Sequence, residues 1–295
     1  MRMFFEMRSR YRFKSTIFLF RSLMDPLRKF LVNPTKASAN QVKLKNWDPQ
    51  YTWNKNKIDT VTEMDQFSKN ISELQYKLFA ANNKSLLIIL QGADASGKDG
   101  TIRQVMGALN PQNCYVKSFK VPNDAELAHD YLWRIHTEVP SKGQIAIFNR
   151  SHYEDIIEPF VNNLISKDQL ILRCKQINDF EKYLSENGIT IIKFFLHISK
   201  EEQRRRLQER IQDPTKQWKI NENDVVSHRN WDKYVGIYEK ILSSCSKKWA
   251  PWYIIPANVK HFRNWVISYI ILKKLETMKP EFPRVVIDPS EFMLD

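Results

Sequence analysis

Short apolar segments alternate with longer amphipathic ones along most of the chain. The clearest short segment is the run of five apolar residues from Leu86 to Leu90, a pattern typical of a strand buried on both faces. Four further strands are predicted at residues 115–121, 144–148, 190–198 and 252–255. Strands that alternate with helices form parallel sheets covered on both faces. The pattern therefore predicts an α/β fold with a five-stranded, mainly parallel, doubly wound sheet.

The longer segments carry apolar residues at helical spacing. Residues 60–82 show this spacing most clearly, from Val61 to Leu78, and predict a helix ahead of the first strand. Further helices are predicted after the glycine-rich turn that follows the first strand, and at residues 123–136, about 153–187, 199 onwards and about 259–275. Asn123 and Ser199 are each followed three positions later by glutamate, which is the signature of a helix N-terminus.

The predicted elements divide the chain into three parts. Residues 41–280 contain them all and form one domain, which is preceded by a basic extension at 1–40 and followed by a tail at 281–295. The apolar stretch within residues 1–23 is too short for the core of a signal peptide. Two interpretations stay open: a membrane-touching or targeting extension, and a reading frame whose natural start is Met24.

A glycine-rich turn, GADASGKDG at residues 92–100, follows the first strand directly. The order of strand, spaced glycines, lysine and helix is that of a phosphate-binding P-loop, in which backbone N–H groups and a mobile lysine contact the anion. A turn without a ligand is the plain alternative. We expect phosphate to lie against the loop residues Gly92, Ala95, Ser96, Gly97, Lys98, Asp99 and Gly100.

The residue after the P-loop lysine is unusual. It is normally Ser or Thr, whose hydroxyl binds magnesium, whereas this chain has Asp99 there and a second carboxylate, Asp94, inside the loop. Two carboxylates that face a polyanion make chemical sense when they bind a divalent cation. Asp94 and Asp99 are therefore the candidate ligands of Mg²⁺, for which Mn²⁺ could substitute.

Polar residues also end two other predicted strands. Lys120 lies near the end of one, and Asn149 and Arg150 directly follow another. Because neighbouring parallel strands share one crevice at their carboxyl ends, we expect these residues to converge on the P-loop. A P-loop enzyme usually has a metal-positioning carboxylate where Asn149 stands, so a neutral amide changes the charge beside the phosphates by one unit. A simple strand-end turn is the alternative role of Asn149.

A basic cluster follows the fourth predicted strand, at residues 201–219. Arg206 and Arg210 lie four positions apart on one helix face, and Lys216 and Lys219 come from the loop beyond. A helix and loop that bring cations onto phosphates form the lid of many phosphotransfer enzymes. The alternative is a solvated helix whose glutamates and arginines pair four positions apart.

The charge of the chain bears on its partners. It has 46 Lys and Arg against 33 Asp and Glu, a net charge of +13, which favours a polyanionic partner over a diffusely basic surface. Its three cysteines lack metal-ligand spacing and indicate a reducing compartment, hence the cytoplasm. No apolar run reaches the roughly 18 to 20 residues that span a bilayer, so we expect no transmembrane segment.

Seven collinear motifs extend this interpretation: GADASGKDGTI (92–102), VKSFKVP (116–122), HDYLWR (129–134), IFNRSHYED (147–155), KFFLHISKEEQ (193–203), DPTKQWK (213–219) and WAPWYIIPA (249–257). With these motifs the chain resembles the polyphosphate kinase 2 family, class III, over roughly residues 40–275. The resemblance implies a P-loop kinase-like three-layer α/β/α fold with a helical lid at about 201–232.

The resemblance also implies roles for matching residues. The Walker A positions fall on Asp94, Gly97, Lys98 and Asp99, and the Walker B positions on Asn149 and Arg150. The cations of the lid fall on Arg205, Arg206, Arg210, Lys216 and Lys219. The residues expected in catalysis are Asp94, Lys98, Asn149, Arg150, Arg206 and Arg210. Other members have Asp where Asn149 stands, and Asn there resembles the variant that accepts AMP as well as ADP.

The implied activity is a cytoplasmic, Mg²⁺-dependent transfer of the terminal phosphoryl group of inorganic polyphosphate to AMP and ADP, giving ADP and ATP. The implied assembly is a homodimer or homotetramer. An ATP-dependent nucleoside monophosphate kinase is an alternative with the same fold, but it gives no reason for the charge of +13. A nucleotide-gated nucleic-acid-binding protein is a second alternative. No nucleic-acid motif supports it, so we expect no nucleic-acid partner.

Overall fold

The computed structural model describes residues 25–35, 41–107 and 109–284. Its sheet has five strands: β1 (Ser85–Gln91), β2 (Cys114–Ser118), β3 (Ile145–Asn149), β4 (Ile189–His197) and β5 (Trp252–Pro256). They lie in the order β2-β3-β1-β4-β5, and each neighbouring pair is parallel. This confirms the predicted α/β fold. It also places β1, and the loop that follows it, in the middle of the sheet.

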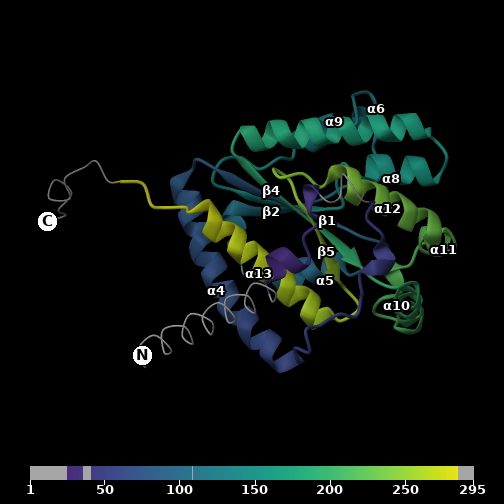
Figure 1. Cartoon of the computed structure of the whole chain (residues 1–295), viewed down its shortest axis with the longest axis horizontal. Coiled ribbons are helices and arrows are strands. Elements are labelled where there is room, and N and C mark those ends of the chain that lie inside the picture. Colours follow the sequence, from purple (N-terminus) through teal and green to yellow (C-terminus); the bar gives the residue numbers. More distant parts are fainter. Residues whose placement is uncertain (1–24, 36–40, 108, 285–295) are drawn as a thin grey trace, which may run out of the picture.

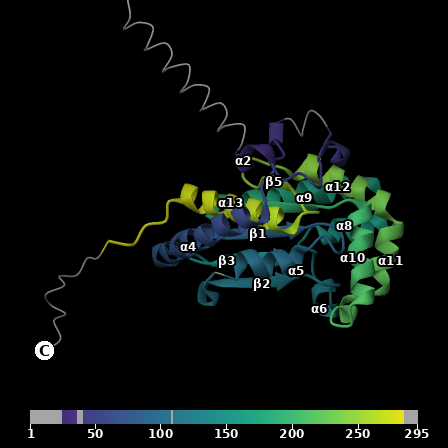
Figure 2. The same cartoon turned by 90° about the horizontal axis from the view of Figure 1, so that it is seen from below.

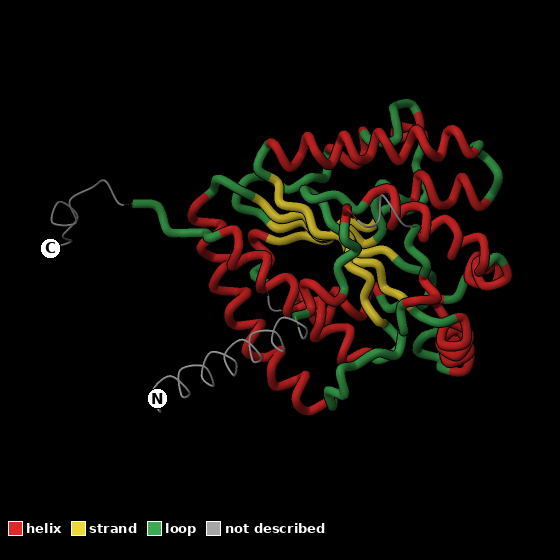
Figure 3. The backbone as a smooth tube through the Cα atoms, in the orientation of Figure 1, coloured by secondary structure: helices red, strands yellow, loops and turns green. Residues whose placement is uncertain are grey.

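Helices cover both faces of the sheet. The described helical segments are α2 (Pro26–Lys29), η1 (Leu44–Asn46), α4 (Lys57–Ala81), α5 (Lys98–Thr101), η2 (Ile102–Met106), η3 (Pro111–Asn113), α6 (Asp124–Leu127), α7 (Trp133–His136), α8 (Glu154–Val161), α9 (Lys167–Glu186), α10 (Lys200–Gln212), η4 (Gln217–Lys219), α11 (Glu222–Arg229), α12 (Trp231–Cys245) and α13 (Lys260–Met278). Figure 1 shows α8, α9 and α12 on one side of the sheet and α4 and α13 on the other. Figure 3 shows the strands between these two helical layers.

The alternation of side chains along β1 explains the three layers. Leu87 and Ile89 point into the core under α8, α9 and α12, whereas Leu86, Ile88 and Leu90 point into the core under α4 and α13. All five side chains are fully buried. The uninterrupted apolar run therefore serves two cores at once, as expected for a central parallel strand.

The register brings three strand ends to one level. Leu90 of β1 pairs with Asn149 of β3, and Ser118 of β2 pairs with the same Asn149. The segments that follow these strands therefore leave the same edge of the sheet. Helices α10 and α11 stand beyond this edge (Figure 2).

Two predicted helices are interrupted. The helix expected at 123–136 forms as α6 and α7, because the side chain of Asp130 accepts a hydrogen bond from the backbone N–H of Leu132 and closes a turn. The helical stretch expected at 153–187 forms as α8 and α9, and Ser166 begins α9 with a capping box. In both places a local side-chain cap competes with helix continuation.

Residues 25–35, which the sequence analysis assigned to the extension, pack against the domain. The backbone N–H of Val32 donates to Trp252 O at 2.9 Å, and the N–H of Ile254 donates to Phe30 O at 2.9 Å. Phe30 and Val32 are each only 2% exposed. This segment covers β5, whose edge would otherwise present unpaired backbone groups.

The interpretations kept open for residues 1–23, and most of the tail at 281–295, lie outside the described residues. Within the described ranges, no helix combines the length and apolar character that crossing a membrane requires.

Candidate active site

The loop after β1 has the backbone of a tight phosphate-binding turn. Gly97 lies directly before α5 with φ +102°, a conformation that side chains rarely adopt, and a Cβ there would collide with the guanidinium of Arg263. Gly92 is similarly constrained, because its Cβ would lie 2.8 Å from the carbonyl oxygen of Leu196. Both glycines are thus required by the shape of the loop.

Lys98 bends back across the loop that it follows. Its Nζ donates to the carbonyl oxygen of Gly92 at 2.7 Å and to that of Ala93 at 3.3 Å. Burial, and then the nearby Arg150, lower the pKa of Lys98. The ammonium makes no ion pair among the described residues, so its charge stays available to an anion at the mouth of the loop.

Arg150 connects the ends of β1 and β3. Its Nη2 lies 3.0 Å from Asp94 Oδ1, and its Nη1 lies 3.5 Å from Glu154 Oε2. The backbone of Arg150 has φ +64°, an uncommon conformation for a residue with a side chain. Strained residues of this kind are often found at functional sites. The structure therefore brings Asp94 and Arg150 together, as the sequence predicted.

Asn149 lies beside the other loop carboxylate. Its Nδ2 donates to Asp99 Oδ1 at 2.8 Å, which leaves the second carboxylate oxygen of Asp99 without a hydrogen-bond partner among the described residues. The amide of Asn149 thus orients Asp99 without adding charge.

The two loop carboxylates, Asp94 and Asp99, are of the chemical type that binds a divalent cation. No group of three or more His, Cys, Asp or Glu side chains within the described ranges is placed to hold a metal. Mg²⁺, however, commonly uses only one or two carboxylates and completes its shell with water and substrate phosphates. Asp94 and Asp99 both lie in the P-loop and carry hard oxygen atoms of this kind, so they are the candidate ligands of a metal shared with phosphate.

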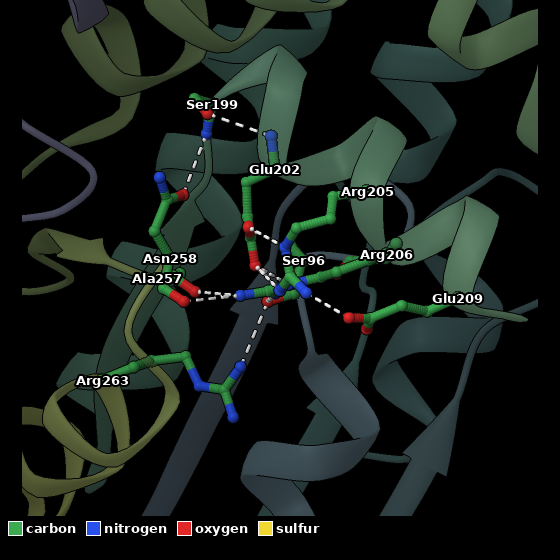
Figure 4. A network of polar contacts seen from close by, with 10 residues as sticks. Ser96, Ser199, Glu202, Arg205, Arg206, Glu209, Ala257, Asn258 and Arg263 are labelled. Atoms are coloured by element: carbon green, nitrogen blue, oxygen red, sulfur yellow. Dashed lines mark hydrogen bonds and ion pairs between the residues drawn. The ribbon is translucent and has the colours of Figure 1, made fainter. Parts of the chain in front are cut away.

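Arg206 differs from its expected role as a lid residue that contacts phosphate. It is 6% exposed, and its guanidinium donates to the carbonyl oxygens of Ala95 at 3.0 Å and Ser96 at 2.9 Å. It also donates to the carbonyl oxygens of Ala257 and Asn258 (Figure 4). Because its donors are occupied by backbone groups, Arg206 supports the loop from behind.

The other lid cations do not contact the P-loop. Arg205 pairs with Glu202 at 2.7 Å and with Glu209, as in the solvated-helix alternative. Arg210 lies 3.6 Å from Asp224. Lys216 pairs with Asp213, and Lys219 lies over the ring of Trp218.

A large cavity opens beside Asp94 and Arg150. Its volume is about 830 Å³, and it lies between the segment after β2, helices α6 and α8, and helix α11. Lys120 lines it, as the sequence predicted for a residue near this edge, and so do the apolar side chains of Phe119, Val121 and Leu127. Pockets of this size and composition accommodate small organic ligands.

Sequence reasoning missed three residues that shape the site. Arg134 is 5% exposed, and its Nη2 donates to both carboxylate oxygens of Asp155 at 3.0 Å on the wall of the cavity. Gln203 donates to the backbone oxygen of Asp94 at 3.1 Å and fixes the start of α10 to the loop. Arg263 lies behind Gly97. Arg134 and Gln203 lie inside two of the family motifs, so the sequence offered a signal for these two residues. Arg263 lies in an amphipathic helix outside every motif, so the sequence offered none.

The model of the Polyphosphate kinase 2 family matches residues 53–283. The chain belongs to the polyphosphate kinase 2 family. It is therefore a phosphotransferase, and both the family and the P-loop kinase-like fold expected from the sequence are confirmed.

Individual relatives of this polyphosphate kinase 2 chain support the same family assignment. It is 42% identical over 260 residues to the AMP/ADP-polyphosphate phosphotransferase of Meiothermus ruber, which covers 88% of this chain and 96% of that protein. It is 40% identical over 227 residues to the ADP-polyphosphate phosphotransferase of Rhodopseudomonas palustris, which covers 73% and 78% of the two chains. The crystal structure of polyphosphate kinase 2 from Arthrobacter aurescens superposes with a TM-score of 0.86 at 35% identity, over 91% of this chain and 95% of that one.

Proposed function

We propose that the chain transfers the terminal phosphoryl group of inorganic polyphosphate to AMP and to ADP, giving ADP and ATP. The observation that carries this proposal is that the P-loop and the cavity of about 830 Å³ share Asp94 and Arg150 at their boundary. A phosphate chain on the loop and a nucleotide in the cavity would then meet at these two side chains. The similarity to relatives named for AMP and ADP supports this choice of acceptors.

Phosphoryl transfer needs in-line positioning and neutralisation of charge more than covalent help from the protein. The amides of the P-loop and Lys98 would hold the phosphates at the transfer point, and Arg150 would contact the transferring group. Asp94, held by Arg150 at 3.0 Å, would orient the acceptor. The exposed lid cations and the net charge of +13 would hold the rest of the polyphosphate.

Asp94 and Asp99 would hold the divalent ion, which we propose is Mg²⁺, with Mn²⁺ as a substitute. When bound, such an ion neutralises charge on the phosphate oxygens. Because Asn149 is neutral, the carboxylates beside the ion number two instead of three. From the resemblance to members that have Asp at this position, we propose that Asn149 is what admits AMP as well as ADP.

We further propose a cytoplasmic homodimer or homotetramer without a nucleic-acid partner. The three cysteines, Cys114, Cys174 and Cys245, are free thiols, which suits a reducing compartment.

The test is to incubate the purified chain with long-chain polyphosphate, Mg²⁺ and AMP, without ATP, and to follow ADP and ATP by chromatography. Formation of both products, only when polyphosphate is present, supports the proposal. If added ADP is converted but AMP is not, the role proposed for Asn149 is wrong, whereas polyphosphate remains supported as the phosphoryl donor. Products that form only after ATP is supplied would favour an ATP-dependent monophosphate kinase.

A further inference from the structure

Two buried arginines from different helices converge on the carbonyl oxygen of Ser96 in the P-loop (Figure 4). Arg206 of α10 donates to it at 2.9 Å, and Arg263 of α13 donates to it at 3.2 Å. Arg263 is only 3% exposed. Its Nε and Nη2 donate to Oδ1 of the neighbouring Asn264 at 3.0 and 2.9 Å.

Only one of these two arginines has a carboxylate partner. Glu202 pairs with Arg206 at 2.6 Å, whereas Arg263 makes no ion pair in the part of the chain that the structure describes. Burial, and then repulsion by Arg206, lower the pKa of Arg263 to about 10. The guanidinium is therefore still protonated at neutral pH, as an unpaired charge inside the protein. Burying such a charge is strongly unfavourable unless another interaction offsets it.

The position of Arg263 indicates what that interaction is. A Cβ on Gly97 would collide with its Nη1, and a Cβ on Gly100 would lie 3.6 Å from its Nη2. The guanidinium thus packs directly behind the turn whose N–H groups, in a P-loop, face phosphate. In this low-dielectric setting a charge behind the loop acts strongly on an anion in front of it.

We propose that Arg263 is a positioning residue whose unpaired charge is neutralised by the phosphate chain bound on the opposite side of the P-loop. In the ligand-free protein the charge of Arg263 is therefore left without a carboxylate partner among the described residues, and the bound phosphate anion supplies the opposite charge. The identity of that anion as polyphosphate rests on the proposed function. The alternative is a purely structural role, in which Arg263 only donates to the carbonyl oxygen of Ser96. In that case it would not matter for phosphate binding that Arg263 lacks a carboxylate partner.

Asn264→Asp separates these two roles. It keeps the acceptor oxygen that Arg263 already contacts but supplies the missing negative charge. We expect the ligand-free variant to unfold at a temperature no lower than that of the wild type, because a buried pair forms. We also expect its Kd for polyphosphate to rise about tenfold, since the charge behind the loop is already neutralised. Kd is measured by titration calorimetry at fixed salt, and unfolding by calorimetric scanning.

Three further variants complete the test. Arg263→Gln should weaken binding by a similar factor, and Arg263→Lys, which keeps the charge, should restore most of it. Lys273→Gln removes one positive charge from the same helix, ten residues or about 15 Å farther along, and should leave binding unchanged.

Wild-type affinity in a folded Asn264→Asp variant would overturn the proposal, and it would do so even if Arg263→Gln failed to fold. ATP serves as a second polyphosphorylated ligand. If the wild type binds ATP but not polyphosphate, and Asn264→Asp weakens ATP binding, the proposed function fails while the role of Arg263 stands. If the wild type binds neither ligand, both fail.

Discussion

The amide of Asn149 donates to the carboxylate of Asp99 at 2.8 Å, across the gap between the end of β3 and the start of α5. This contact joins the position of the usual Walker B carboxylate to the residue that replaces the usual Walker A hydroxyl. Two unusual residues of the P-loop pattern are therefore in direct contact. The neutral amide at position 149 accommodates the carboxylate of Asp99, because a second carboxylate at position 149 would face Asp99 at hydrogen-bond distance and repel it.

Asn149→Asp should lower the rate with AMP relative to the rate with ADP by about tenfold. The substitution replaces the hydrogen bond to Asp99 by like-charge repulsion, and so disturbs a carboxylate that we propose binds the metal. The measurement is kcat/KM for each acceptor at saturating polyphosphate. Asn149→Ala, which removes the hydrogen bond without adding charge, is the control. An unchanged ratio in Asn149→Asp would refute the link between this residue and AMP.

Lys98→Ala should reduce kcat with both acceptors by at least about a hundredfold while the protein stays folded. Its ammonium makes no ion pair among the described residues, and we propose that it contacts phosphate. Lys84→Ala is the matched control, because Lys84 lies at the opposite end of β1 and donates to Met278 O at 3.4 Å. Full activity in Lys98→Ala, with an unchanged circular dichroism spectrum, would show that the site is elsewhere.

Removal of divalent ions by chelation should abolish transfer, and added Mg²⁺ should restore it. Asp99→Asn should raise the Mg²⁺ concentration needed for half-maximal rate by about tenfold, because one of the two candidate ligands loses its charge. Asp168→Asn, at an exposed position on α9, should not change it. An unchanged Mg²⁺ requirement in Asp99→Asn would remove Asp99 from the metal site.

Leu127→Glu should raise KM for AMP by about tenfold and leave KM for polyphosphate near its wild-type value. Leu127 lines the cavity proposed for the nucleotide and is 66% exposed, so the change places a charge against the ligand without disturbing the core. Ile58→Glu is the control, because Ile58 is also exposed but lies on α4, outside the cavity, and this variant should leave KM for AMP unchanged. Equal effects of the two substitutions would argue against a nucleotide in this cavity.

A fully buried ion pair joins β4 to α9. Lys193 donates to Glu181, to the hydroxyl of Tyr153 at 2.8 Å and to the carbonyl oxygen of Cys245 at 2.8 Å. Lys193→Met should destabilise the protein by about 3–5 kcal/mol in urea unfolding at pH 7, because Glu181 is left as an unpaired buried charge. The double variant Lys193→Met, Glu181→Leu should recover part of this loss.

The same variant should show a defined pH dependence. Burial alone would raise the pKa of Glu181, but Lys193 and His152 hold it below its ordinary value of 4.5. Such a carboxylate stabilises the fold above its unfolded pKa, and this stabilisation is lost as pH falls through the lower folded pKa. Without Lys193, burial raises the pKa instead. The difference in unfolding free energy between wild type and Lys193→Met should therefore shrink as pH falls from 7 to below 4.5.

Local signals were enough to predict the sheet and the P-loop. The apolar run at Leu86 to Leu90, followed by spaced glycines, indicated a strand buried on both faces, and the glycines at 92 and 97 mark a turn that side chains would block. The convergence of Asn149 on the loop followed from parallel topology. These features depend on sequence neighbours or on one general rule of sheet geometry.

Features that depend on distant contacts were not predictable in this way. Arg206 has the spacing of a lid residue, and only the fold shows that backbone carbonyls from residues 95, 96, 257 and 258 occupy its donors. Arg263 has no motif at all. The burial of Phe30 and Val32 depends on the exposed edge of β5, more than two hundred positions away.

Because α10 and α13 support the P-loop, the parts of the site become available in a fixed order during synthesis of the chain. Arg206 and Arg263 follow Ser96 by 110 and 167 residues, so a growing chain displays the loop sequence long before either arginine has been synthesised. Until α13 docks, the loop lacks both the contact that shapes it and the charge behind it. If these arginines support phosphate binding as proposed, the ability to bind phosphate would arise only when nearly the whole domain has been made. Incomplete chains released during synthesis would then leave the cell's polyphosphate untouched.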